Sequence, residues 1–94
     1  MGLEAYLAQL EEKRAILDEF LAHYNDGRRK TLFNTAVYLL PLEDLRSAMA
    51  ALNSQPELAG QPIKERALAA VELLQEAADR RGISLKLNKK LKKG

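Results

Sequence analysis

The sequence of 94 residues predicts an all-α protein, a small antiparallel four-helix bundle with a basic, partly extended C-terminal tail. Apolar residues recur at intervals of three and four along most of the chain, which is the period of an amphipathic helix. Most of the glycines and prolines fall between these stretches and mark where helices end. With 47% hydrophobic and 30% charged residues, the composition is that of a folded domain rather than a disordered chain. We therefore expect a helical bundle over 1–82 and a basic arm over 83–94.

The first helix is predicted from Leu3 to Tyr24. One stripe of positions, alternately four and three residues apart, consists of Leu3, Leu7, Leu10, Arg14, Leu17, Leu21 and Tyr24. Ile16 and Phe20 widen this stripe into a face that packs in a bundle. Arg14 is the one charge on the stripe. Either its stem lies on apolar neighbours while the guanidinium reaches water, or it forms a buried ion pair or a ligand contact.

The second helix is predicted over 28–40, after a turn in which Gly27 ends the first helix and Asp26 caps the second. Its apolar residues cover more than half of its circumference, so we expect it to be the most buried helix. Asn34 and Thr35 are polar within this helix. A buried amide must find a partner, which is either a loop carbonyl or a bound group.

The third and fourth helices follow a proline break and a proline-rich connector. Pro41 starts the third helix, 41–53, whose inner face consists of Leu42, Leu45, Met49 and Leu52. In the connector, Ser54 and Glu57 have the spacing of a capping box around one short turn. The fourth helix begins at Pro62 and ends at about residue 81, and its alanine-rich stripe favours close packing on the second helix.

Charge is distributed unevenly along the chain. Residues 1–79 contain 8 basic and all 13 acidic residues, a net charge of −5, whereas residues 80–94 contain 7 basic residues and no acid. Ile83, Leu85 and Leu87 alternate with Ser84 and Lys86, which predicts an arm lying over the bundle. The alternative is a short strand, whose partner strand would come from another molecule.

The candidate site for an anion or a partner is basic. It comprises Arg28, Arg29, Lys30, Arg80, Arg81, Lys86, Lys89 and Lys90. The first three stand at a predicted helix start, where free backbone N–H groups and guanidinium groups suit phosphate or carboxylate. Alternatively, these side chains neutralise nearby acids such as Asp26 at a solvated turn. The tail lysines either bind nucleic-acid phosphates or form a solubilising terminus.

Several functional classes receive no support from the sequence. The chain has no cysteine and one histidine, His23, which we expect at the surface near the end of the first helix. No phosphate-binding loop, dinucleotide-binding glycine pattern or metal-ligand spacing is present. No stretch approaches the roughly 20 apolar residues of a membrane span, and acids occupy the place of a signal peptide's basic region. We expect a cytoplasmic protein that is not an enzyme and binds no cofactor, metal or membrane.

Two functions remain for such a domain. The first is a non-catalytic interaction or regulatory module, in which the first helix or the grooves beside it bind a protein partner and residues 28–30 contact an acidic group on it. The second is an accessory protein that binds nucleic acid weakly and without specificity through residues 28–30 and the lysine-rich tail. A bundle this small also gains stability by pairing, so a homodimer is a further hypothesis.

Overall fold

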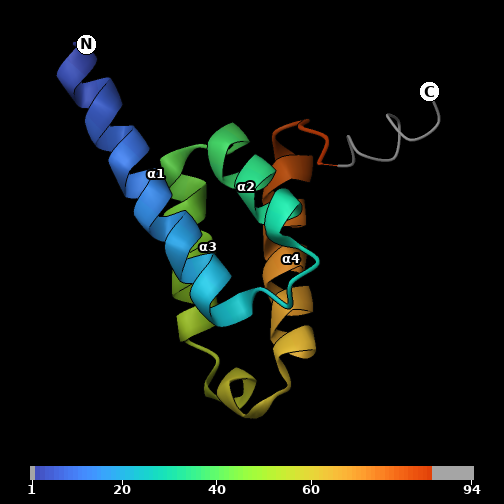
Figure 1. Cartoon of the computed structure of the whole chain (residues 1–94). Coiled ribbons are helices and arrows are strands. Elements are labelled where there is room, and N and C mark those ends of the chain that lie inside the picture. The colour runs from blue at the N-terminus through green and yellow to red at the C-terminus, as the bar shows by residue number, and fades with distance from the viewer. Residues whose placement is uncertain (1, 86–94) are drawn as a thin grey trace.

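The computed structural model, which describes residues 2–85, is an all-α bundle, and this confirms the predicted fold class. Its elements are α1 (Leu3–Tyr24), α2 (Lys30–Leu39), α3 (Leu42–Asn53), the 3₁₀ helix η1 (Pro56–Gly60) and α4 (Ile63–Arg80). Successive α-helices run in alternating directions, and α1 packs against each of the other three (Figure 1). Within residues 2–85 there is no strand, and no helix has both the length and the apolar composition that crossing a membrane requires.

The four helices share one apolar core. Phe20 of α1 and Phe33 of α2 are fully buried, and their rings stack with centroids 5.5 Å apart. Leu45 of α3 and Leu74 of α4 are also fully buried and belong to the same cluster. The alanine stripe of α4 lets that helix approach α1 and α3 as well as α2, so the predicted packing on α2 is one of three contacts.

The C-terminal end of α4 is closed by two backbone hydrogen bonds. Gly82 adopts a left-handed conformation with φ of 70°, and its N–H donates to the Asp79 carbonyl at 3.2 Å. The N–H of Ile83 reaches back to the Ala78 carbonyl at 2.8 Å, which completes a Schellman motif. The chain then lies on the bundle, where Leu85 is buried, as predicted for the start of the arm. Residues 86–94 lie outside the described part of the chain.

The start of α2 differs from the prediction. The helix begins at Lys30, two residues later than expected, and its N-cap residue is Arg29, with no side-chain cap. Asp26 does not cap α2, because its Oδ1 accepts a hydrogen bond from the Arg28 N–H at 3.0 Å within the turn itself. Gly27 has φ of 91°, which a residue with a Cβ rarely adopts.

Two other local predictions are wrong. Ser54 does not form a capping box with Glu57, because its hydroxyl donates to the Ala51 carbonyl at 2.9 Å at the end of α3. The last carbonyls of a helix lack intrahelical donors, and Ser54 is the C-cap residue that stands next to them. Asn34 is exposed, since it lies on the solvent side of α2, so it is not a buried amide in need of a partner.

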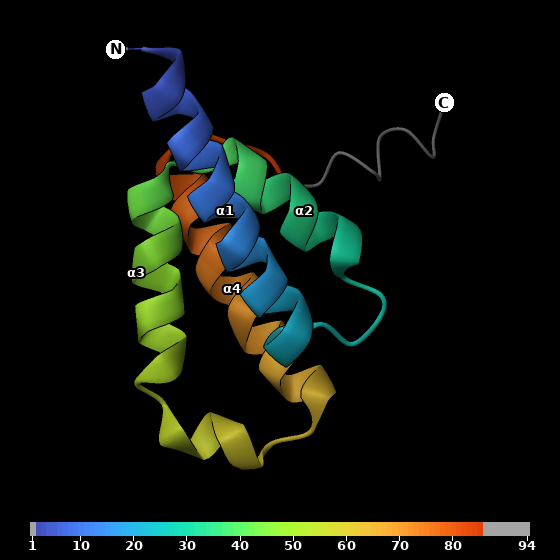
Figure 2. The same cartoon turned by 60° about the vertical axis from the view of Figure 1, so that its left-hand side comes forward.

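The first helix is much longer than α2 and α3, two of the three α-helices that pack on it. With 22 residues, α1 is about 33 Å long, whereas α2 and α3, with 10 and 12 residues, are about 15 and 18 Å long. The N-terminal end of α1 therefore extends past the rest of the bundle, as both views show (Figures 1 and 2). The buried residues of α1 are Ile16, Leu17, Phe20 and Tyr24, all in its second half. The prediction that the whole apolar stripe packs in the bundle is wrong for the first half.

Candidate functional site

The projecting end of α1, defined here as residues 3–9, is an uncovered apolar surface. Leu3, Tyr6 and Leu7 are exposed at 71%, 57% and 47%, which makes them the most exposed large apolar side chains in the described chain. They lie three and four residues apart, so they share one face of the helix. Every residue from position 2 to 9 is exposed, and Leu10 is the first that the bundle partly covers.

Two further exposed apolar side chains lie at the end of α2. The last turn of α2 carries Tyr38 and Leu39, each exposed at 46%. The two helices are in contact, and Figure 2 shows the end of α2 beside α1. The sequence analysis placed Leu3 and Leu7 on the stripe of α1 that packs in the bundle. The difference in predicted helix lengths was the signal that could have identified an uncovered end of α1.

An ion pair with two hydrogen bonds joins α1 to α3 close to the projecting end. The guanidinium of Arg46 on α3 donates from Nε and Nη2 to the two carboxylate oxygens of Glu12, each at 2.7 Å. Hydrogen bonding by Arg46 lowers the pKa of Glu12, and the same contact raises the pKa of Arg46. This paired geometry connects α1 to α3 at the turn that follows the projecting end.

The predicted basic site begins at the turn between α1 and α2, where both arginines contact one carboxylate. Arg29 donates from Nη1 to Asp26 Oδ2, and Arg28 Nη2 lies 3.7 Å from the same oxygen. The Arg28 N–H and then the Arg29 guanidinium lower the pKa of Asp26, so this acid stays ionised beside them. Lys30 is exposed in the first turn of α2. The turn therefore carries less unbalanced positive charge than its sequence suggests.

The second group of predicted site residues lies at the other end of α2. Arg81 follows α4 and donates to Asp44 at 2.9 Å and to Glu43 at 3.0 Å, at the start of α3. These hydrogen bonds, the one to Asp44 first, raise the pKa of Arg81. Arg80 is exposed.

The structure does not bring the two groups together. Residues 28–30 precede α2, and Arg81 contacts the start of α3, which follows α2; a helix about 15 Å long separates them (Figure 1). Lys86, Lys89 and Lys90 lie outside the described residues, so their position relative to either group stays a prediction.

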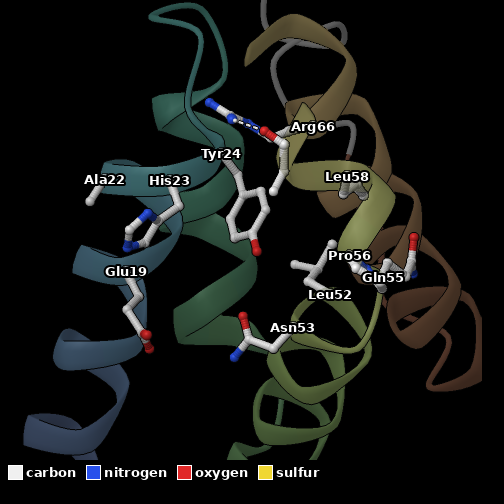
Figure 3. A pocket seen from close by; sticks show the side chains of 11 residues that line it. Glu19, Ala22, His23, Tyr24, Leu52, Asn53, Gln55, Pro56, Leu58 and Arg66 are labelled. Carbon is white, nitrogen blue, oxygen red and sulfur yellow. Dashed lines mark hydrogen bonds between the residues drawn. The ribbon is translucent and has the colours of Figure 1, made fainter. Parts of the chain in front are cut away.

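A cleft of about 310 Å³ lies between the ends of α1 and α3, η1 and the start of α4 (Figure 3). Tyr24 stands inside it with its hydroxyl directed toward the end of α3, and Glu19 and His23 form the α1 side. Burial raises the pKa of Tyr24, Glu19 raises it further and Arg66 opposes the shift, so the phenol remains a hydrogen-bond donor.

The polar groups of this cleft make few hydrogen bonds within residues 2–85. Arg66 donates weakly to the Ala59 carbonyl at 3.5 Å, and its buried Nε has no partner within residues 2–85. No serine, threonine or cysteine lines the cleft beside His23. In the described part of the chain, no cluster of three His, Cys, Asp or Glu residues could hold a metal ion. The cleft is large enough to hold water or a small polar group.

Comparisons of the chain with family models, curated proteins and solved structures found no match. The choice among functions therefore depends on the surfaces described above.

Proposed function

We propose that this protein is a small, non-catalytic, cytoplasmic interaction module whose projecting end of α1 binds an apolar surface on another protein chain. The observation that carries this proposal is the exposure of Leu3, Tyr6 and Leu7 on one face of α1, at the end that extends past the rest of the bundle. These side chains contribute nothing to the core, and contiguous apolar surfaces on small domains are typical of sites that a partner covers. A helix face with anchors three and four residues apart is a common form of such a site.

The ion pairs favour this function over nucleic-acid binding. Arg28 and Arg29 contact Asp26, and Arg81 contacts Glu43 and Asp44, so three of the predicted cationic groups already have anionic partners. A phosphate backbone would have to compete with those carboxylates for each guanidinium. The first function proposed from the sequence also included a contact between residues 28–30 and an acidic group of the partner. Lys30, which is exposed, is available for that contact.

The proposal is tested by capture of partners on the immobilised protein, with bound proteins identified by mass spectrometry. We expect Leu7→Glu to lose proteins that the wild type retains, because the substitution puts a charge in the centre of the apolar face. Leu68→Glu is the matched control, since Leu68 is an exposed leucine on α4, far from residues 3–9 in the sequence. Equal capture by the wild type and both variants would contradict the proposal.

A further inference from the structure

We propose that the cleft between the ends of α1 and α3, η1 and the start of α4 binds a small organic carboxylate. The carboxylate of the ligand pairs with Arg66, and a polar group at its other end hydrogen bonds to Tyr24. This site is separate from the projecting end of α1, so it goes beyond the proposed function. The inference depends on the charge of Arg66, the hydroxyl of Tyr24 and the apolar side chains that line the cleft.

Arg66 is a partly buried cation without an anionic partner. It lies in the first turn of α4, and within residues 2–85 it takes part in no ion pair. Its hydrogen bond to the Ala59 carbonyl is long, at 3.5 Å, and its buried Nε has no acceptor in that part of the chain. Partial burial of a charge is unfavourable unless an opposite charge lies beside it. Arg66 and the positive end of the α4 dipole therefore favour an anion in the cleft.

Tyr24 supplies a hydrogen-bonding group on another side of the cleft. The residue is only 8% exposed, and its hydroxyl is directed into the cleft toward the end of α3, where Asn53 lies (Figure 3). Within the described residues this hydroxyl has no hydrogen-bond partner. Burial raises the pKa of Tyr24, so the phenol stays protonated and is able to donate. A polar group of the ligand would supply the partner that a buried hydroxyl requires.

The remaining lining residues indicate the orientation and the body of the ligand. Glu19 lies on the α1 side of the cleft, where its carboxylate repels an anion, so the carboxylate of the ligand belongs on the α4 side, at Arg66. Leu52, Pro56 and Leu58 contribute apolar surface. The volume of about 310 Å³ has room for one aromatic ring. The ligand class is therefore an aryl carboxylate with a hydroxyl group opposite the carboxylate.

The first experiment uses 4-hydroxyphenylacetate as the probe, titrated into the isotope-labelled full-length protein and followed by amide chemical shifts. We expect saturable shifts at the residues that line the cleft, with a Kd on the order of 1 mM for a ligand of this size. The neutral analogue 4-hydroxyphenylacetamide should bind at least fivefold more weakly, because it lacks the charge that pairs with Arg66. Absence of saturable shifts, or equal affinity for the acid and the amide, would overturn the inference.

The second experiment assigns the carboxylate to Arg66. Arg66→Gln should weaken binding of the acid about tenfold, to the affinity of the amide, because it removes the paired charge. Arg80→Gln is the matched control, since Arg80 is an exposed arginine of the same helix that forms no ion pair within residues 2–85. Glu19→Gln should tighten binding of the acid, because it removes a repulsive charge. Equal effects of Arg66→Gln and Arg80→Gln would overturn the inference.

The third experiment assigns the polar end of the ligand to Tyr24. The wild type should bind 4-hydroxyphenylacetate several-fold more tightly than phenylacetate, and Tyr24→Phe should remove this preference while keeping the aromatic ring. A preference that survives in Tyr24→Phe would overturn the proposed orientation. Circular dichroism of each variant should match the wild type. The comparison of acid with amide needs only the wild type, so it decides the inference even if a variant fails to fold.

The carboxylate site and the proposed function can fail separately. Leu7→Glu, on the projecting end, should leave the Kd of the probe unchanged, and Arg66→Gln should leave partner capture unchanged. Loss of probe binding in Leu7→Glu would contradict a site confined to the cleft. Capture that depends on Leu7 in a protein that binds no probe would overturn the carboxylate site and leave the proposed function standing.

Discussion

Asp26 and Gly27 explain why three cations can stand at the start of α2. Partial positive charge at a helix N-terminus disfavours nearby cations, yet the Asp26 carboxylate accepts hydrogen bonds from both Arg28 and Arg29. The turn itself could be predicted from the sequence, because aspartate and glycine are typical turn residues. The direction of the Asp26 side chain could not be predicted, because a carboxylate just before a helix can accept hydrogen bonds from donors of the turn as readily as from donors of the helix.

The left-handed conformation of Gly27 leads to the first prediction. Gly27→Ala should lower the free energy of unfolding by about 1–2 kcal/mol, because a Cβ is strained at φ of 91° even where no atom crowds it. Gly60→Ala is the matched control, since Gly60 has no positive φ and equally open surroundings. We expect the control to be neutral or stabilising by about 0.4–1 kcal/mol. Urea denaturation of both variants measures the difference, and similar losses would contradict the prediction.

The second prediction concerns the response of Asp26 to pH. Its pKa in the folded protein is below the unfolded value of about 3.9, so its stabilising effect is present above pH 4 and is lost as pH falls through the folded pKa. Asp26→Asn should therefore lower Tm at pH 7, and the difference from the wild type should narrow at pH 2.5. Asp18→Asn, at an exposed acid of α1 that forms no ion pair within residues 2–85, should show no such change. A Tm difference for Asp26→Asn that is independent of pH would contradict this assignment.

Among the helices, α1 shows what periodicity predicts and what it cannot. Its bounds, Leu3 to Tyr24, agree with the prediction, and the predicted bounds of α3 and α4 are within one residue. The stripe has the same spacing in both halves of α1, but only the second half, beside the other three α-helices, is buried. Spacing records which residues share a face, whereas burial also requires a neighbour of sufficient length. The candidate surface therefore lies where the stripe continues past the neighbouring helices.

The third prediction is that the projecting end is not needed for folding. A chain that lacks residues 2–7 should have a free energy of unfolding within about 0.5 kcal/mol of the full chain, because none of these residues is buried. The measurement belongs at low micromolar protein or below, where pairing adds no stability. Phe20→Ala, in the buried half of the same helix, is the contrasting variant and should cost about 3–5 kcal/mol. A large loss on truncation would mean that residues 2–7 support the bundle.

Across the molecule, two ion pairs connect parts of the chain that the sequence separates. Glu12 and Arg46 are 34 residues apart, and Asp44 and Arg81 are 37 residues apart. The four helices and their core faces could be predicted because each depends on local spacing. These pairs could not, because any acid on one helix is a possible partner for several bases on another. Arg81 contacts the start of α3, at the opposite end of α2 from the turn at residues 28–30, so no single basic face joins them.

The last prediction follows from how charge is divided along the chain. Residues 1–85 contain 10 basic and 13 acidic residues, a net charge of −3, whereas the last nine residues contain five lysines and no acid. We expect the full chain to be retained on heparin at low salt only, because five lysines release few counterions. A chain truncated after Leu85 keeps the buried residues of the core and should not be retained. The double variant Arg28→Gln and Arg29→Gln should elute with the wild type, since Asp26 already neutralises part of that turn. Retention of the truncated chain, lost on substitution of the two arginines, would instead support nucleic-acid binding at the turn.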